Sequence, residues 1–400
     1  MSIIVFCLPL LTLLAYKLIA PAMVVLTVIL LLRRRSRLAA GFRRHKSIAI
    51  IFGALIILTL ALSPFSITPR ESLFLSLDIL ALVICILTLL GTVVELPDPG
   101  QPIRALACGL AVSTIVFLVD RMSGWPLLGM LPSAKAAVMG GSYYNRRATA
   151  AVLFLFPVLA GFWQLGHGHR AAAVALGLLV AMQVALAESS AAQLALVFSL
   201  AAVSFVLAFG RTGIRFITLA AALVIFAHPW IVRSMIHAGT LQIVADQPIP
   251  ASWQHRLCIW SFSADRIMER PLTGWGPDTA RAIGKRWGDT ECTVVAAAGE
   301  PGTKFVGNPI PLHPHNGALQ LWLEYGAAGA LIGSWLVTLL GFEIGNAGQA
   351  RWRGFASGQL TAALCIALTA YGLWQMAWLA TVAAAAILMR LAAGTRNGAT

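Results

Sequence analysis

The sequence predicts an all-α, polytopic integral membrane protein, and two observations lead to that class. Hydrophobic residues make up 59% of the 400 positions and charged residues only 11%, which gives a mean hydropathy of +0.82. A water-soluble protein of this size needs a larger polar surface than that. In addition, apolar runs of about 17 to 25 residues recur between short polar gaps, and each is long enough to cross roughly 30 Å of hydrocarbon as a helix.

We predict about twelve transmembrane helices. They cover approximately residues 2–15, 17–32, 47–65, 72–95, 104–119, 148–166, 171–187, 191–209, 216–235, 317–342, 354–372 and 374–392. The first two are short and are interrupted by Lys17, so one kinked span over residues 2–32 is an alternative. The chain then divides into N-terminal spans within residues 1–235, a large loop with short helices at 236–316, and C-terminal spans within 317–400.

The distribution of Lys and Arg predicts the orientation of these spans, because positive charges are retained in short cytoplasmic loops. The strongest cluster lies between the second and third spans, at residues 33–37 and 43–46. Counting spans from there, the basic segments at 167–170, 210–215 and 351–353 and the tail with Arg396 fall on the same side. The net charge of +14 therefore follows from topology and requires no nucleic-acid partner.

Two segments on the opposite side are too long to be turns, namely 120–147 and the larger loop, and function is expected there. That loop carries seven Lys and Arg against seven Asp and Glu, so an anion site in it must come from individual arginines. It also carries Cys258 and Cys292. They could form a disulfide in an oxidising compartment, but the sequence gives no distance between them. No Cys/His cluster or Gly-rich phosphate loop indicates a metal or a cofactor.

One helix is expected inside the loop, from Trp253 to about Arg270, with Ser252 as its N-cap and Pro271 after its end. Arg256 and Trp260 would share a face of it at the i, i+4 spacing. A guanidinium offers paired donors to a phosphate, and an aromatic neighbour limits its motion. The alternative is a solvated arginine that packs its stem on Trp260.

The stretch His313-Pro314-His315-Asn316 stands where the loop leads into the next apolar helix. The positive end of a helix favours a neutral imidazole at His315 and attracts phosphate, and a neutral imidazole can accept a proton. The alternative is a surface histidine beside a helix cap at Asn316. Further along, Glu324 lies inside the apolar helix, where a carboxylate requires partners or a polar cavity.

These motifs also occur together in order. A His-Asn pair followed after nine residues by Gly-x-x-Gly is met by His315, Asn316, Gly326 and Gly329. An Arg-x-x-x-Trp pair followed by Pro-Leu-Thr-Gly-Trp-Gly is met by Arg256, Trp260 and residues 271–276, and residues 143–147 and 371–375 add further similarity. With them the chain resembles the O-antigen ligase and O-antigen polymerase family of bacterial envelope glycosyltransferases.

The resemblance implies transfer of a glycan from undecaprenyl diphosphate to an acceptor hydroxyl, without metal or cofactor, on the periplasmic face of the bacterial inner membrane. The acceptor is the lipid A core for a ligase, or the end sugar of another lipid-linked repeat for a polymerase. His315 would take the acceptor's proton, and Arg256 would stabilise the departing diphosphate, with inversion at the sugar carbon. Further contacts to diphosphate or glycan are expected from Arg146, Arg147, Arg266, Arg281, Trp260, Asn316 and His313.

One departure from the family pattern concerns a cation. The family carries an arginine after a serine early in a span, where this chain has Ser190. Its absence would weaken diphosphate binding unless Arg146, Arg147 or Arg233 reaches the site.

Other functions remain open at this stage. A transporter of the same lipid-linked glycan would be expected to carry charged residues along its span interiors, whereas here they gather at one surface and in one loop. A non-catalytic assembly partner is a third possibility. Moderate length and a single large loop favour a ligase over a polymerase.

Overall fold

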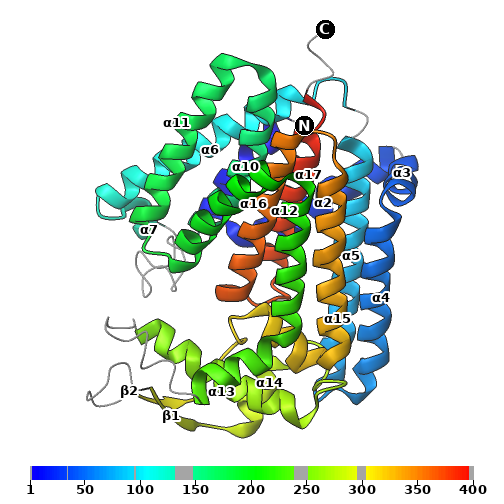
Figure 1. Ribbon diagram of the computed structural model, residues 1–400, viewed down its shortest axis with the longest axis vertical. Coiled ribbons are helices and arrows are strands. Elements are labelled where there is room, and N and C mark those ends of the chain that lie inside the picture. Colours follow the sequence, from blue (N-terminus) through cyan, green and yellow to red (C-terminus); the bar gives the residue numbers. More distant parts are fainter. Residues whose placement is uncertain are drawn as a thin grey trace.

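The computed structural model describes residues 2–33, 35–93, 96–130, 147–237, 251–294 and 303–395. These residues form a helical bundle with one small hairpin of strands at its lower end (Figure 1). The helices are α1 (Ser2–Leu14), α2 (Ile19–Arg33), α3 (Ser36–Arg44), α4 (Lys46–Leu62), α5 (Pro69–Val93), α6 (Gly100–Met122), α7 (Pro126–Met130), α10 (Ala148–Leu165), α11 (His167–Leu186), α12 (Ser190–His237), α13 (Ala251–Glu269), α14 (Ala280–Trp287), α15 (Gly317–Asn346), α16 (Ala350–Thr369) and α17 (Met376–Ala392). The strands β1 (Thr290–Val294) and β2 (Thr303–Gly307) pair antiparallel.

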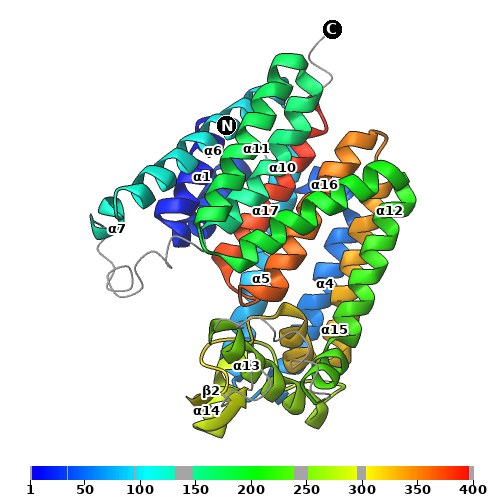
Figure 2. The same cartoon turned by 60° about the vertical axis from the view of Figure 1, so that its left-hand side comes forward.

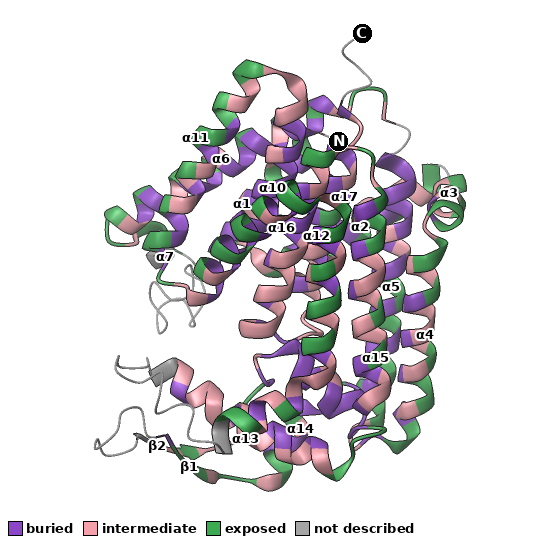
Figure 3. Ribbon diagram, viewed as in Figure 1, coloured by how far each residue is buried: buried purple, intermediate pink, exposed green. Residues whose placement is uncertain are grey.

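The helices confirm an all-α, multi-pass membrane protein. Eight helical segments among the described residues are long and apolar enough to cross a membrane, and α1 and α17 are shorter apolar helices. The expected count of about twelve differs from this one because α1 and α17 are short, α16 is not among the eight, and α12 covers two of the predicted spans. Helices α4 and α11 consist mainly of half-buried and exposed residues, as for helices that contact lipid (Figure 3).

Helix α12 is two helices joined at a sharp break. Gly210 adopts φ 58° and ψ −129°, which is not helical. The rings of Phe205 and Phe216 are 6.0 Å apart, whereas residues eleven positions apart in a straight helix would be separated by about 16 Å. The chain therefore turns back at Gly210, as Figure 2 shows for the green ribbon beside α15 and α16. The two spans predicted at 191–209 and 216–235 correspond to these halves.

Helix α15 is also broken, at Gly326, which adopts φ 62° and ψ −152°. A short helix before the break, residues 317–325, precedes a 20-residue segment, 327–346, that is about 30 Å long and can cross the membrane. The span expected at 317–342 therefore begins later than predicted, because the sequence pattern treats Gly326 as an ordinary helical residue.

The turn formed by residues 271–276 closes this break. The amides of Trp275 and Gly276 donate to the carbonyls of Leu323 and Glu324 at 2.9 and 3.0 Å, and the Ala327 amide donates to the Pro271 carbonyl at 2.8 Å. These are backbone groups that the break would otherwise leave without partners in an apolar bundle. The two glycine-containing motifs of the sequence thus bond to each other.

Glycine is required where the turn and the break meet. A Cβ on Gly326 would lie 2.4 Å from the backbone carbon of Leu272, and a Cβ on Gly274 would lie 2.4 Å from that of Glu324. Both glycines also have positive φ. No side chain fits at either position without moving the backbone.

The basic clusters come together at one end of the bundle. Burial together with the nearby Arg390 and Arg44 lowers the pKa of His45, which links α17 to the cluster beside α3. The indole of Trp352 donates to the Met389 carbonyl at 3.0 Å, which links α16 to the same end. Figure 1 shows α3 at the end opposite α13, α14 and the hairpin, while Arg396 of the predicted basic tail lies outside the described residues.

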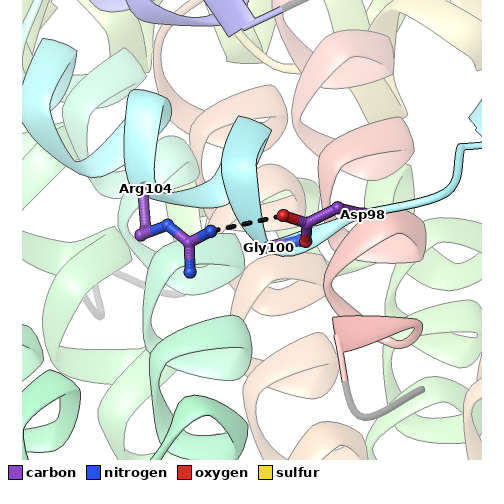
Figure 4. Close-up of polar contacts among 3 residues, drawn as sticks. All are labelled: Asp98, Gly100 and Arg104. Atoms are coloured by element: carbon purple, nitrogen blue, oxygen red, sulfur yellow. Dashed lines mark hydrogen bonds and ion pairs between the residues drawn. The ribbon is translucent and has the colours of Figure 1, made fainter. Parts of the chain in front are cut away.

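Two further sets of contacts lie at the same end of the bundle as these basic clusters. Trp163 lies beneath the guanidinium groups of both Arg170 and Arg351. Nearby, the start of α6 is fixed by Asp98, which accepts the Gly100 amide at 2.8 Å and lies 3.4 Å from Arg104 (Figure 4). That pair is about half exposed and contributes little to stability.

The large loop packs as a small unit against α12 and α15. Helix α13 begins at Ala251, so the prediction that Ser252 caps a helix starting at Trp253 was wrong: the first turn extends two residues further back. Its end at Glu269, followed by Pro271, agrees with the prediction. Cys258 and Cys292 form a disulfide with Cα atoms 5.9 Å apart, which resolves the question left open by the sequence and joins α13 to β1.

We predict that Gly326→Ala and Gly274→Ala each severely reduce the yield and the unfolding temperature of the purified protein, because strain of about 1–3 kcal/mol adds to the steric clash. Gly168→Ala is the control, since a Cβ there meets nothing within 4 Å. Wild-type thermal unfolding of Gly326→Ala, followed by tryptophan fluorescence, would contradict this account.

We also predict that replacing Cys258 and Cys292 together by serine destabilises the loop by about 3 kcal/mol, because the disulfide closes a segment of 34 residues. Faster proteolysis of the loop in membrane vesicles measures the effect. Cys365→Ser, which removes a free cysteine, should leave the rate unchanged. Identical gel mobility of the wild type with and without reductant would count against the disulfide.

Candidate functional site

His315 is held in an unusual backbone conformation just before the short helix of α15. Its φ is 55°, which costs a residue with a Cβ roughly 1–2 kcal/mol. Its ring nitrogen Nδ1 lies 2.8 Å from the carbonyl oxygen of Ala370. Because a carbonyl only accepts hydrogen bonds, Nδ1 carries the proton in the neutral ring, and Nε2 carries the lone pair. The ring is half-buried, so the tautomer that suits a general base is set by the fold.

His313 contacts both the backbone and the ring of His315. It is 5% exposed, its Nδ1 accepts the backbone amide of His315 at 3.1 Å, and the two rings are 4.1 Å apart. Since Nδ1 accepts, neutral His313 carries its proton on Nε2, 3.0 Å from the amide nitrogen placed on Gln375, and a hydrogen bond there requires that amide to be turned so that its Oε1 accepts. These contacts are those of a positioning residue rather than of a substrate ligand.

Asn316 caps the short helix, as the sequence indicated. Its Oδ1 accepts the amides of Ala318 and Leu319, both at 3.1 Å, a contact worth about 1 kcal/mol. Its Nδ2 is 2.7 Å from Nε2 of His228 in α12. Asn316 is 1% exposed. It therefore fixes the loop to two helices at once and is not placed to bind substrate.

Glu324 has the partners that its burial requires. It is 0% exposed, and it accepts from the Gln320 amide at 2.9 Å, the Trp374 indole at 2.5 Å and the Asp278 backbone amide at 2.9 Å. Gln320 in turn accepts the Leu373 amide at 2.8 Å. This network joins α15 to residues 370–375, the segment before α17. The same segment contacts the rings of His313 and His315.

The carboxyl of Asp278 belongs to the same neighbourhood. Partial burial, together with the nearby carboxylates of Glu71 and Asp78, raises the pKa of Asp278 to about 6. Carboxylates therefore collect on the Glu324 side of the turn, which makes that side unfavourable for a diphosphate.

Arg256 and Trp260 lie on the face of α13 that is bonded to the histidine segment. The Trp260 indole donates to the carbonyl of Pro314 at 2.9 Å, next to His315. The Arg256 guanidinium lies over the ring of Trp253, 5.3 Å from its centre, and Trp253 packs edge-on against Trp260. Trp253 is thus an aromatic neighbour of the arginine that the sequence analysis did not name, and it lies on the same helix face as Trp260.

The other arginines named from the sequence have different surroundings. Arg266 pairs with Glu269 at 2.5 Å and lies over the rings of Phe262 and Trp287, while Arg281 is exposed on α14. Arg147 is 8% exposed; it donates to the Thr12 carbonyl at 3.2 Å and lies over the Tyr16 ring, so it fastens α10 to the N-terminal helices. Arg146 lies outside the described residues.

Sequence reasoning missed several members of the site. His228, Gln320 and the Ala370 carbonyl were not predicted, although a histidine within an apolar span was a signal for the first. Near Ser190, the first residue of α12, the structure places an arginine from another helix: Arg121 donates to Glu188 at 2.6 Å. Arg121 was not among the suggested substitutes; of those, Arg233 lies 3.8 Å from Asp265.

Comparison with known proteins finds similarity over the part of the chain that contains this site. The family model described as O-antigen ligase matches residues 172–332, which include α13, the turn and the histidine segment. A candidate polysaccharide ligase of Rickettsia conorii is 26% identical over 72% of this chain and 66% of its own length, just under two thirds. One of Rickettsia felis is 27% identical over 82% of this chain and 76% of its own length.

A third relative, a candidate polysaccharide ligase of Rickettsia bellii, is 34% identical over 34% of this chain and 31% of its own length. The family suggests an enzyme that joins polysaccharide to an acceptor. The motifs, the membrane-embedded helical bundle and these matches make the chain similar to the O-antigen ligase family, with the family match confined to residues 172–332.

Proposed function

We propose that this protein transfers a glycan from undecaprenyl diphosphate to an acceptor hydroxyl, the lipid A core, at the periplasmic face of the bacterial inner membrane. The observation that carries the proposal is the hydrogen bond from His315 Nδ1 to the Ala370 carbonyl, because it leaves the lone pair on Nε2. The orientation is supported by the gathering of basic clusters at the other end of the bundle, and by a disulfide in the loop, which is typical of an oxidising compartment.

In the proposed reaction, Nε2 of His315 accepts the proton of the acceptor hydroxyl as that oxygen attacks the sugar carbon. The new bond forms as the bond from that carbon to the diphosphate oxygen breaks. Attack from the side opposite the leaving group inverts the carbon. The proton remains on His315 until it passes to water.

Arg256 is proposed to bind the diphosphate as negative charge grows on it. Its guanidinium is held against Trp253 on the helix face that meets Pro314. The amino end of the short helix of α15 adds partial positive charge to the same region. In this scheme no metal ion is required, and the loop at 236–316 is the catalytic unit of the chain.

A polymerase that adds the glycan to another lipid-linked repeat would use the same groups. The two reactions differ in what accumulates when the protein is absent. Bare lipopolysaccharide core together with lipid-linked polymer indicates a ligase, whereas core bearing a single repeat indicates a polymerase. An unchanged ladder in the deletion strain would mean that neither reaction is the one this protein performs.

We predict that His315→Asn and Arg256→Ala each reduce transfer by at least about a hundredfold and that neither complements the deletion strain. Asparagine tolerates positive φ at position 315, so the loss would not arise from backbone strain. Arg211→Ala, an exposed arginine at the opposite end of the bundle, should keep full activity. Wild-type lipopolysaccharide ladders in His315→Asn cells, with equal protein in the membrane, would rule out His315 as the base.

We also predict that His313→Phe lowers kcat about 10- to 100-fold with little change in KM, because the amide of His315 loses its acceptor. His313→Asn should recover most of that loss, since its Oδ1 can take the place of Nδ1. Steady-state kinetics with purified lipid-linked donor measures both values. A rise in KM alone for His313→Phe would instead indicate that His313 contacts substrate.

A further inference from the structure

A groove of about 580 Å³ lies between α13 and the β-hairpin and has no role in the proposed transfer step. This volume is in the range of sites that hold a small organic ligand. The groove is lined by His255, Cys258, Ile259, Ser261, Phe262, Asp265, Thr290, Glu291, Cys292, Phe305, Val306, Gly307, Asn308, Pro309 and Pro311.

The groove occupies the opposite face of α13 from the candidate phosphate site. At 3.6 residues per turn, His255, Phe262 and Asp265 share one side of the helix, while Trp253, Arg256 and Trp260 share the other. The contacts agree with this division. The ring of His255 lies 5.4 Å from that of Phe305 in the hairpin, whereas the Trp260 indole bonds to Pro314.

The charges of the groove do not suit a phosphate. Among the described residues no Lys or Arg lines it, whereas Asp265 and Glu291 do. Each carboxylate has a cation beside it outside the lining: Arg233 Nε is 3.8 Å from Asp265, and Lys304 Nζ is 2.8 Å from Glu291. A diphosphate would therefore meet carboxylates with no lining cation, while a neutral polar ligand would meet an electrically balanced surface.

A metal ion also fails to fit. Within the part of the chain that the structure describes, no three His, Cys, Asp or Glu side chains gather in a way that could hold one. With phosphate and metal ions excluded, the groove offers hydrogen-bond acceptors beside flat apolar side chains.

The remaining groups suit a saccharide. Carboxylate, amide and hydroxyl oxygens of Asp265, Glu291, Asn308 and Ser261 can accept or exchange hydrogen bonds with sugar hydroxyls. The side chains of Asp265 and Glu291 are 44% and 56% exposed, so they are reachable from water. The half-buried rings of Phe262 and Phe305 offer apolar faces to the C–H surface of a sugar ring.

The walls of the groove are fixed relative to each other and to the histidine segment by a disulfide and by short stretches of backbone. The Cys258–Cys292 disulfide joins α13 to β1 within the lining itself. The wall at Asn308–Pro311 continues directly into His313, and the Asn308 side chain accepts the Ile310 amide at 2.9 Å. One wall of the groove is therefore only a few residues from the candidate base, His315, along the chain.

We propose that this groove binds sugar residues of a substrate glycan, at a distance from the bond that is formed, and so selects which glycan is used. The inference rests on the proposed function. The sugar can come from the donor polymer or from the acceptor core, which share this chemistry.

The test measures binding without turnover, using the full chain in nanodiscs and isothermal titration calorimetry. The probes are core oligosaccharide and repeat polysaccharide, both released from lipopolysaccharide of the same bacterium by mild acid, and farnesyl diphosphate as a headgroup without a glycan. Phe305→Leu keeps apolar volume but removes the ring, and Asp265→Asn removes one carboxylate. Asp289→Asn, an exposed residue outside the lining, is the matched control.

Either oligosaccharide should bind the wild type and bind Phe305→Leu and Asp265→Asn about tenfold or more weakly, with Asp289→Asn unchanged. Which of the two binds identifies its source. Farnesyl diphosphate should bind these three variants as it binds the wild type. An unfolding temperature equal to that of the wild type, followed by tryptophan fluorescence, verifies that each variant is folded.

Failure of both oligosaccharides to bind, or equal affinity in the groove variants and the wild type, overturns the groove proposal and leaves the transfer reaction untouched. Conversely, activity retained in His315→Asn overturns the proposed base. The groove result is unaffected by that outcome, because binding is measured without transfer.

Discussion

A helix broken inside an apolar bundle exposes amides and carbonyls that water cannot reach, and each must find another partner. The break of α15 at Gly326 meets that requirement through the turn at residues 271–276, which supplies two amides and one carbonyl. Directly after this turn, the Pro277 carbonyl accepts the hydroxyl of Ser72, in the first turn of α5, at 2.6 Å. The loop is thereby docked on the bundle by backbone bonds, and the position of every group in the candidate site follows from this docking.

The histidine segment depends on the short helix that the break creates. Because residues 317–325 form a separate piece, their amino end can face the segment between α16 and α17, where the Ala370 carbonyl and Gln375 meet the two histidine rings. A continuous helix would carry His315 away from that segment. Backbone strain at His315 is tolerated because Ala370, His313 and the Asn316 cap all restrain the same few residues. The strained backbone of His315 lowers stability, but it places Nδ1 against the Ala370 carbonyl and so defines the tautomer of the ring. Local strain of this kind is common at functional sites.

The class of fold could be predicted from the sequence because it depends on composition and on run length, which are local properties. The need for partners at Glu324 was also predictable, since an isolated carboxylate in an apolar helix is costly. Their identity was not: Asp278 and Trp374 come from 46 and 50 residues away. Trp253 and Trp260 flank Arg256 at helical spacings of three and four residues, so spacing alone did not single out Trp253, whose ring lies beneath the guanidinium. The helix breaks at Gly210 and Gly326 were not predicted either, because a glycine in an apolar run is compatible with either a helix or a turn.

Helix α13 gives the two proposed sites a fixed separation. A helix is stiff on the length of a few turns, so a phosphate contact on one face and a sugar contact on the other cannot drift relative to each other as they would on an irregular loop. Three attachments hold the helix itself: the disulfide to β1, the Trp260 indole on Pro314, and the bond from the Trp275 indole to the Arg266 carbonyl at 2.9 Å. Binding energy gained from remote sugars can then be used to place the reacting carbon beside His315, because little of it is lost in ordering the protein. A flexible loop with the same residues would bind the same groups but would position them less well.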